Sequence, residues 1–399
     1  MELATRSVDS LLHGRKLVPG ETCEIAPNLL FRRQGQIKFL PNARNVVGRS
    51  GLNAEARAFL SRPQAAQPDL PTGIFEMRDV LLAPPYGMIL DLNNQCCWTG
   101  SMLGWSERDF QKSEKPDNFT ALEKAIRFEL PKADDIHELE TAVLISAPHY
   151  FNYGHWLLEF LPRIDLALSA GFGDLPLYAH PGQDWSETLA RCLGPVNFVP
   201  HASASASFTR VKRLIVPSVA RIQNSGDDVA LKAAWARLSD GLAHMAPAPD
   251  PFANRSRGRK IAVSRRGWTN SVNLRRLINT NRMERMLVDQ GFEIHQPHTM
   301  SLADQRNLFH DADVIVGEDG SALHNTIYSR PGTRIGLVAM GRINYLHLLT
   351  AAALGHWVTF IPTEISRDHE ANWFLEIYRL RPRELLSSLA ELLQFGGLT

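Results

Sequence analysis

A histidine and a glutamate one helical turn apart are the first residues in this sequence that could do chemistry. They belong to the stretch Asn152-Tyr-Gly-His-Trp-Leu-Leu-Glu-Phe-Leu-Pro-Arg163. If the chain is helical after Gly154, His155 and Glu159 lie on one face, where they can share a proton or approach a substrate hydroxyl. A general base needs that reach. The alternative is a hydrogen-bonded pair with a structural role only, and the spacing does not separate the two.

Arginines form the second candidate group. The stretch Val263-Ser-Arg-Arg-Gly267 places Arg265 and Arg266 at the end of a predicted strand, and Arg275 follows after a short loop. Open α/β sheets bind ligands beyond the carboxyl ends of their strands, and arginine forks match phosphate oxygens. The arginines could therefore form a phosphate-binding site, but a solvated basic loop is the commoner role of such a cluster.

A glycine-serine turn after an apolar strand is the third candidate. It lies in Val314-Ile-Val-Gly-Glu-Asp-Gly-Ser-Ala-Leu-His-Asn325. We expect backbone N–H groups at the start of the following helix to point outward, an arrangement that attracts phosphate. Gly320 would let a ligand approach the backbone, and Ser321 could donate a hydrogen bond to a diphosphate oxygen. The alternative is an ordinary turn in which Ser321 only caps the helix.

Several familiar signatures are missing from the sequence. Gly171-Phe-Gly173 is followed by Pro176 where the dinucleotide fingerprint needs a third glycine, and neither a Gly-Lys-Ser/Thr loop nor a Gly-x-Ser-x-Gly elbow occurs. NAD-dependent enzymes, ATP-dependent enzymes and serine hydrolases are therefore disfavoured. The pair His155 and Glu159 lacks the His-Glu-x-x-His spacing of a metal site. We predict no metal and no cofactor.

The elements that must position these residues are regular beyond residue 260. Strands alternating with helices predict parallel βαβ units in a Rossmann-like sheet. The predicted strands are 260–264, 292–295, 314–317 and 334–338, and the helices between them are 282–290, 302–312 and 323–329. Alternating prolines in Ala246-Pro-Ala-Pro-Asp-Pro251 indicate a linker before this part.

The N-terminal half is less regular. Apolar runs separated by turn residues predict short strands at 37–40, 80–83 and 88–92. Further along, hydrophobic periodicity predicts helices at 118–130, 156–170 and 228–244 and strands at 141–146 and 214–217. We therefore divide the chain into a strand-rich section 1–110, a Rossmann-like domain 111–245, a linker 246–259, a second Rossmann-like domain 260–375 and a segment 376–399. The last segment contains a leucine-patterned helix over 382–395, expected to pack on a domain surface.

Composition limits the class of protein. A chain of 399 residues with 44% hydrophobic and 21% charged residues is expected to form two domains. A net charge of +1 argues against nucleic acid as a partner. Four scattered cysteines favour a reducing compartment, and neither a signal peptide nor a membrane-spanning stretch is predicted. We expect a cytoplasmic protein, with peripheral attachment to the inner face of the membrane left open.

Taken in order, these stretches resemble the family 61 glycosyltransferases, inverting enzymes that include many bacterial polysaccharide-assembly proteins. The resemblance covers about residues 141–338 and includes Gly291-Phe-Glu, Ser301-Leu-Ala-Asp-Gln305 and Pro331-Gly-Thr333. It implies a GT-B-like α/β fold of two facing Rossmann-like domains. The donor nucleotide would bind the C-terminal domain and the acceptor the N-terminal one.

The resemblance also implies roles for single residues. His155 and Glu159 would be the catalytic pair. The residues expected on the donor side are Arg265, Arg266, Arg275, Asp319, Gly320, Ser321 and Asn325. Asp319 stands where the family usually has histidine, and a carboxylate beside a diphosphate is electrostatically unfavourable.

We predict transfer of a sugar from a nucleotide-sugar donor to a glycan or other hydroxyl acceptor, inverting and without metal. Glu159 or His155 would act as the base, in a chain that serves surface polysaccharide or capsule biosynthesis. Donor and acceptor are the expected partners, and a homo-oligomer is left open. Asp319 motivates the alternative of a non-catalytic scaffold that binds nucleotide sugars or glycans. A nucleotide-dependent enzyme of another type, such as an oxidoreductase, is a further alternative.

Overall fold

The chain forms two compact units, unit 1 (residues 1–38 and 66–241) and unit 2 (residues 39–65 and 242–399). The computed structural model describes residues 2–7, 28–39, 46–47, 70–99, 103–104, 119–121, 125–129, 131–148, 151–179, 183–199, 207–222, 225–245, 258–268, 276–339, 344, 346–367 and 377–394. Among these residues, none of the helices has the length and apolarity needed to cross a membrane.

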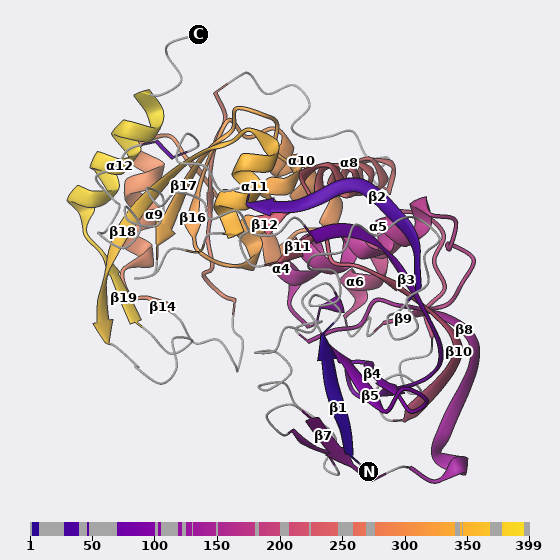
Figure 1. The fold of residues 1–399 in the computed structure, drawn as a ribbon. Helices are drawn as coiled ribbons and strands as arrows, with labels where there is room; N and C mark the ends of the chain where they lie inside the picture. The colour runs from indigo at the N-terminus through magenta and orange to yellow at the C-terminus, as the bar shows by residue number, and fades with distance from the viewer. Residues whose placement is uncertain are drawn as a thin grey trace. The chain divides into compact units, whose positions relative to one another are not determined.

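Unit 1 is built on a mixed sheet of β1 to β12 (Figure 1). Its strands are β1 Glu2–Ser7, β2 Asn28–Phe39, β3 Leu70–Ala83, β4 Met88–Asp91, β5 Cys96–Thr99, β6 Phe119–Ala121, β7 Ala125–Phe128, β8 Ile136–Leu144, β9 Leu177–Tyr178, β10 Phe208–Pro217, β11 Arg221–Ile222 and β12 Ser225–Gly226. Its helices are η3 Ala133–Asp135, α4 Tyr153–His155, η4 Trp156–Phe160, α5 Leu161–Ser169, α6 Asp184–Arg191 and α8 Asp228–Met245.

The parallel part of this sheet determines where a ligand could bind. β8 pairs in parallel with β9 on one side and with β10 on the other, and β9 also forms a parallel bridge to Phe198. In chain order the strand positions therefore run 3-2-1-4, as in doubly wound sheets. The chain reverses direction across the sheet between β8 and β10, and the crevice beyond the carboxyl ends of two such strands is where open α/β sheets bind ligands. We call this place the unit 1 switch point.

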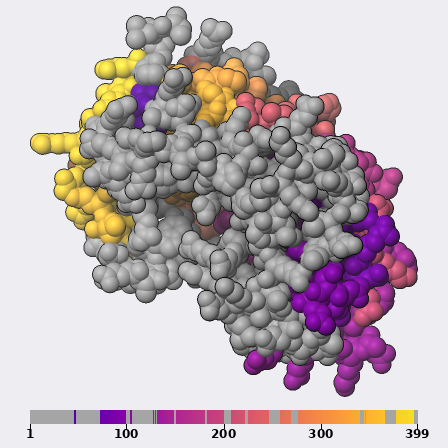
Figure 2. All heavy atoms as spheres, in the orientation of Figure 1, coloured from indigo at the N-terminus to yellow at the C-terminus, as the bar shows by residue number. Residues whose placement is uncertain are grey.

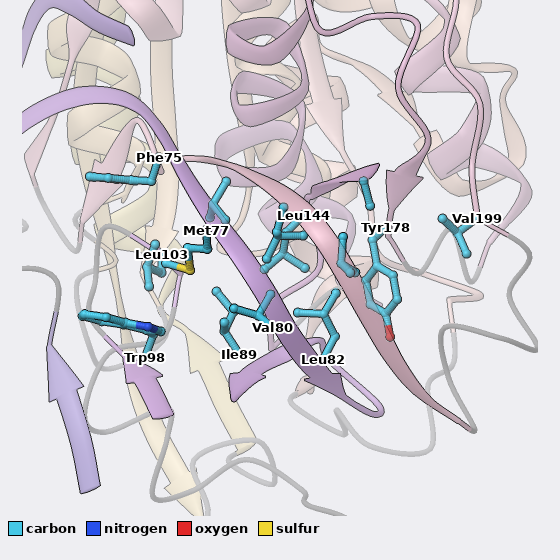
Figure 3. Packing of buried hydrophobic residues seen from close by; sticks show 14 of the residues in the cluster. Phe75, Met77, Val80, Leu82, Ile89, Trp98, Leu103, Leu144, Tyr178 and Val199 are labelled. Atoms are coloured by element: carbon cyan, nitrogen blue, oxygen red, sulfur yellow. The ribbon is translucent and has the colours of Figure 1, made fainter. Parts of the chain in front are cut away.

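Antiparallel strands extend the sheet from β10 through β3, β4 and β5. In β3 the side chains alternate between two buried clusters, with Val80 and Leu82 in one and Leu81 and Ala83 in the other. Successive strand residues point to opposite faces, so both faces of β3 are covered. Figure 3 shows the first cluster, which contains Val80 and Leu82 of β3 and Ile89 of β4. Ile89 is the cross-strand partner of Leu82.

Unit 2 contains a sheet of β13 to β19. Its strands are β13 Lys260–Val263, β14 Arg276–Leu277, β15 Glu293–His295, β16 Val314–Glu318, β17 Arg334–Ala339, β18 Trp357–Arg367 and β19 Ile377–Leu380. Its helices are α9 Thr280–Asp289, η5 Pro297–Thr299, α10 Leu302–His310, η6 Ser321–Tyr328, α11 Leu346–Leu354 and α12 Pro382–Gln394.

Five of these strands run parallel in the order β15-β13-β16-β17-β18. In chain order this is 2-1-3-4-5, the second common order of doubly wound sheets, which has its ligand crevice between strands 1 and 3. The crevice is therefore expected beyond the carboxyl ends of β13 and β16. We call this place the unit 2 switch point.

Helices cover the unit 2 sheet. Val314 and Val316 join a buried cluster with Leu287 of α9 and Leu389 of α12, while Ile315, from the alternate position, is also fully buried. The outer side of α12 lies at the surface (yellow in Figure 2), where Leu386 is 45% exposed. The sheet thus has the two-sided burial expected of parallel strands.

Most predicted elements of the second half are confirmed, within a few residues at their ends. The predicted α-helix over 323–329 is a 3-10 helix, η6. The predicted helix over 118–130 is wrong, because β6 and β7 lie there. β7 pairs with β1, as in Leu3 opposite Ile126, and a partner so distant in sequence overrides local helical periodicity. The mixed α/β class is confirmed; the GT-B-like facing of two domains and the predicted domain boundaries stay predictions.

One buried histidine makes the stability of unit 2 depend on pH. His356 precedes β18 and is fully buried, with Nε2 3.3 Å from the Ser329 carbonyl oxygen. Burial lowers the pKa of His356 from 6.5 to about 4, although the bond to Ser329 opposes the shift. The unfolded chain therefore takes up this proton at a higher pH than the folded chain does, and stability falls as pH drops from 6.5 towards 4.

We expect His356→Gln to reduce the loss of stability between pH 6.5 and pH 4, because a glutamine side chain takes up no proton. In the wild type, the proton uptake of His356 should lower the free energy of unfolding by about 3 kcal/mol over this pH range. Denaturant unfolding at several pH values between neutrality and pH 4 measures it, with the exposed His298→Gln as the matched control. If the free energy of unfolding of His356→Gln fell with pH as steeply as that of the wild type, His356 would not be the group responsible.

Candidate functional site

The helical segment that carries His155 and Glu159 begins at a side-chain cap. Asn152 has an extended backbone, and its Oδ1 accepts hydrogen bonds from the backbone N–H of Gly154 (2.9 Å) and of His155 (3.4 Å). An Asn at this position stabilises a helix start because it satisfies N–H groups that have no partner within the helix. The cap therefore fixes the point at which the chain leaves the β8 loop and turns into helix.

A π-helical turn, η4, follows the cap and contains Glu159. The Leu161 N–H donates to the Trp156 carbonyl instead of to that of Leu157. The Leu157 carbonyl accepts from the buried indole of Trp235, at 2.9 Å. Pro162 comes next and has no N–H, so the regular ladder is interrupted here in any case. Such π-turns frequently occur at functional sites.

The predicted pair is in contact, and a third residue completes it. His155 Nδ1 lies 2.9 Å from Glu159 Oε1, and the guanidinium of Arg221 contacts the same carboxylate oxygen. Arg221 is buried, whereas the side chains of His155 and Glu159 are 27% and 18% exposed. A donor at Nδ1 leaves Nε2 as the acceptor nitrogen of a neutral imidazole. The carboxylate thus orients the imidazole and is itself held by a cation.

Arg221 follows the carboxyl end of β10, so this triad lies at the unit 1 switch point. Arg163, one helical turn after Glu159, joins the two strand ends there. Its Nε donates to the carbonyl of Pro217 at the end of β10 (3.0 Å). Its two other nitrogens donate to Ile145 (3.0 Å) and Leu144 (3.1 Å) at the end of β8.

Arg163 is itself 1% exposed. Burial lowers the pKa of Arg163 to about 9, which leaves it charged at neutral pH. The final arginine of the sequence stretch is therefore a structural clamp that holds the two strand ends at a fixed spacing.

In unit 2 the structure brings Arg265 and Gly320 together at the switch point. Arg265 follows β13, and Gly320 follows β16. The Nη1 of Arg265 donates weakly to the Asp319 carbonyl, at 3.4 Å. A Cβ atom added to Gly320 would lie 3.6 Å from that nitrogen, so the glycine Cα faces the guanidinium directly.

Arg266 points elsewhere. Its guanidinium lies 3.4 Å from the buried carboxylate of Glu284 and 3.5 Å from the amide oxygen of Asn281, both in α9. Glu284 also accepts a 2.6 Å hydrogen bond from the Ser264 hydroxyl, which in turn accepts from the Arg266 N–H. This network fixes the turn before Arg265, and the charge of Arg266 is already balanced. Arg275 lies outside the described residues.

The carboxylate of Asp319 is buried and engaged. It accepts hydrogen bonds from the Asn344 amide and from His347 Nε2, both at 3.1 Å. His347 lies in the first turn of α11 and stacks on His324 of η6, with ring centroids 4.5 Å apart. A carboxylate at a helix start is stabilised by the helix dipole. The carboxylate thus has hydrogen-bond donors within the protein.

Asn325 and Ser321 lie on η6. Asn325 is fully buried, and its amide donates 2.8 Å to Gln305 of α10. This contact attaches η6 to α10. Ser321 is half-buried at the first position of η6, after Gly320, which provides no side-chain cap. A donor-binding role for these two residues stays a prediction.

Arg221 and His347 were missed by sequence analysis, although both carried a signal. Arg221 follows the predicted strand 214–217 after a short connection, and Arg265 comes directly after the predicted strand 260–264, so the rule applied to one arginine also applied to the other. His347 lies within the apolar stretch 343–357, where a buried polar side chain needs a partner. Among the described residues no cluster of three or more His, Cys, Asp or Glu side chains suits a metal ion. Metal independence stays a prediction.

The comparison with protein families agrees with the resemblance noted in the sequence. Residues 153–336 match the family model described as Glycosyltransferase 61. The matched segment contains His155, Glu159, Arg265 and Gly320. No curated protein matches the chain.

Arg163→Met tests the clamp. We expect it to lower the free energy of unfolding by roughly 3 kcal/mol or more, because buried carbonyl groups lose their donors. Chemical denaturation measures the change. Arg191→Met is the control, since Arg191 forms an exposed pair with Glu187 and should cost less than about 1 kcal/mol. Equal effects of the two substitutions would show that Arg163 is no clamp.

Gly320→Ala tests the space beside Arg265. The added Cβ would make only ordinary contacts and the backbone is extended (φ 169°), so stability should not change. The methyl group would fill the place next to the guanidinium, and we expect it to weaken binding of pyrophosphate, measured by calorimetry.

Gly317→Ala is the matched control, because its Cβ would lie 2.9 Å from that of Val263 and should destabilise the fold. Unchanged pyrophosphate binding in Gly320→Ala would place the ligand elsewhere.

Proposed function

Because residues 153–336 place this chain in glycosyltransferase family 61, we propose that it moves a sugar from a nucleotide-sugar donor to a hydroxyl acceptor by a single inverting displacement. The observation that carries the proposal is the contact of Glu159 with both His155 and Arg221, inside the family segment. This set has the parts of a general base: an imidazole, a carboxylate that orients it and a cation that holds the carboxylate.

His155 is the proposed base. The Arg221 cation favours the ionised form of Glu159, so the carboxylate accepts the Nδ1 hydrogen, which leaves Nε2 of His155 as the basic nitrogen of the ring. A glutamate paired with arginine is a poorer proton acceptor than an unpaired one. The sequence left open whether Glu159 or His155 is the general base. These contacts favour His155 as the base, with Glu159 as the group that orients it.

The acceptor hydroxyl oxygen attacks the anomeric carbon of the donor, and its proton passes to His155 Nε2. The bond from the anomeric carbon to the diphosphate breaks, and its electron pair leaves with the diphosphate oxygen. Attack opposite the leaving group inverts the anomeric configuration.

Negative charge grows on the leaving diphosphate, so donors fixed in advance at that point should supply much of the rate enhancement. We propose Arg265 and the backbone at Gly320 for this role, at the unit 2 switch point. Arg265 has no carboxylate partner among the residues that the structure describes. Its positive charge can therefore be directed to phosphate, and the proposal needs no metal.

The engaged carboxylate of Asp319 bears on the scaffold alternative. That alternative rests on repulsion between Asp319 and a diphosphate. Because Asn344 and His347 hold the carboxylate, repulsion is a weaker objection to catalysis. We propose an active transferase, and by family analogy a cytoplasmic step of surface polysaccharide assembly.

A ligand screen tests the donor class. UDP-, GDP-, CMP- and dTDP-sugars are each added to the purified chain, and the melting temperature is recorded. One nucleotide class should raise it, because a ligand that binds only the folded state stabilises that state. The same nucleotide sugar should then be consumed when hydroxyl acceptors are supplied. Absence of both stabilisation and consumption across the panel would remove support for a transferase.

His155→Gln tests the base. We expect turnover with a working donor and acceptor to fall about 100-fold or more, while the affinity for the nucleoside diphosphate stays at the wild-type value. Steady-state rates and calorimetry provide the two readouts. The half-buried His137→Gln in the same unit is the control. Wild-type turnover in His155→Gln would exclude His155 as the base.

A further inference from the structure

Trp268 lies beside Arg265 at the carboxyl end of β13. The backbone N–H of Trp268 donates to the backbone carbonyl of Arg265 at 3.1 Å, which closes a tight turn. Gly267 within this turn has φ 79°, a conformation that glycine adopts without strain. The turn brings the indole to the arginine side chain, whose Cζ lies 5.2 Å from the ring centroid. A guanidinium at that distance from an indole ring is attracted by its π-electrons.

Gly320 lies beside the same guanidinium. A Cβ on Gly320 would lie 3.6, 3.7 and 3.8 Å from Nη1, Cζ and Nε of Arg265. Nearly equal distances to three atoms of a planar group mean that Gly320 faces the plane and not its edge. The indole and the glycine therefore limit where the plane can lie, and neither uses up its N–H groups.

Arg266 provides the contrast. Its guanidinium is directed to the carboxylate of Glu284 and the amide oxygen of Asn281. Arg265 has a weak bond to one carbonyl oxygen and, among the described residues, no carboxylate partner. An arginine side chain has many rotamers, and restricting them before a ligand arrives raises affinity. An aromatic ring does this without neutralising the charge.

Resting on the donor site proposed above, we propose that Trp268 is a positioning residue that holds the Arg265 guanidinium ready for the diphosphate of a nucleotide. Trp268 acts through Arg265 and does not stack on the base. The group recognised is the diphosphate itself. The affinities for inorganic pyrophosphate and for a nucleoside diphosphate should then depend on Trp268 to the same degree.

Calorimetric titration with pyrophosphate, UDP and GDP tests this in Trp268→Leu, Trp268→Phe, Arg265→Ala and the double variant Trp268→Leu/Arg265→Ala. We expect Trp268→Leu to weaken the binding of pyrophosphate and of the nucleoside diphosphate alike, by about tenfold. Trp268→Phe should recover most of the lost affinity. The double variant should bind no more weakly than Arg265→Ala alone, because the two residues act as one unit. Leu386→Ala, partly exposed on α12, is the control.

Two outcomes would overturn the proposal. A loss confined to the nucleoside diphosphate would mean that Trp268 stacks on the base. Losses that add in the double variant would mean that Trp268 and Arg265 act independently.

A measurement without ligand separates this proposal from the donor site. NMR relaxation of the Arg265 Nε–H group reports its order, which should fall in Trp268→Leu and be retained in Trp268→Phe. Unchanged order in Trp268→Leu would overturn the positioning role. If the order falls but the wild type binds neither pyrophosphate nor a nucleoside diphosphate, Trp268 still positions Arg265, and the proposed donor site is wrong.

Discussion

The arrangement of unit 1 depends on one buried cation. Arg163 donates to carbonyl groups at the ends of both β8 and β10, the two strands between which the chain reverses direction across the sheet. Parallel strands that diverge at their carboxyl ends leave carbonyl groups without ladder partners, and a buried carbonyl without a donor is costly. A guanidinium with several N–H groups satisfies them from one side chain. Because Arg163 lies one turn after Glu159, the same clamp fixes the helical segment that carries the proposed base.

Both units follow one rule, in which polar side chains occur where parallel strands end. In unit 1 a helix after β8 and a residue after β10 supply His155, Glu159 and Arg221. In unit 2 the residues after β13 and β16 supply Arg265 and Gly320. Each site has a second set of residues that only holds the first in place, namely the Asn152 cap and Glu284.

The sequence was sufficient for elements whose pattern is local. The alternation after residue 260 predicted the parallel sheet, and the His155–Glu159 spacing predicted a contact that the structure contains. Where a distant partner decides, prediction failed: β7 forms because β1 pairs with it, and no feature of 118–130 announces that partner. The same reason explains Asp319, whose carboxylate accepts a hydrogen bond from His347, 28 residues further along the chain. Arg266 was grouped with Arg265 by adjacency, yet neighbours at a strand end point in different directions.

The most direct test is a crystal structure of the chain with the nucleoside diphosphate that stabilises it most. We expect the diphosphate oxygens within hydrogen-bond distance of the Arg265 guanidinium and of the backbone N–H groups that follow Gly320. A diphosphate bound away from the carboxyl ends of β13 and β16, with Arg265 untouched, would contradict the proposed donor site and the transfer mechanism that depends on it.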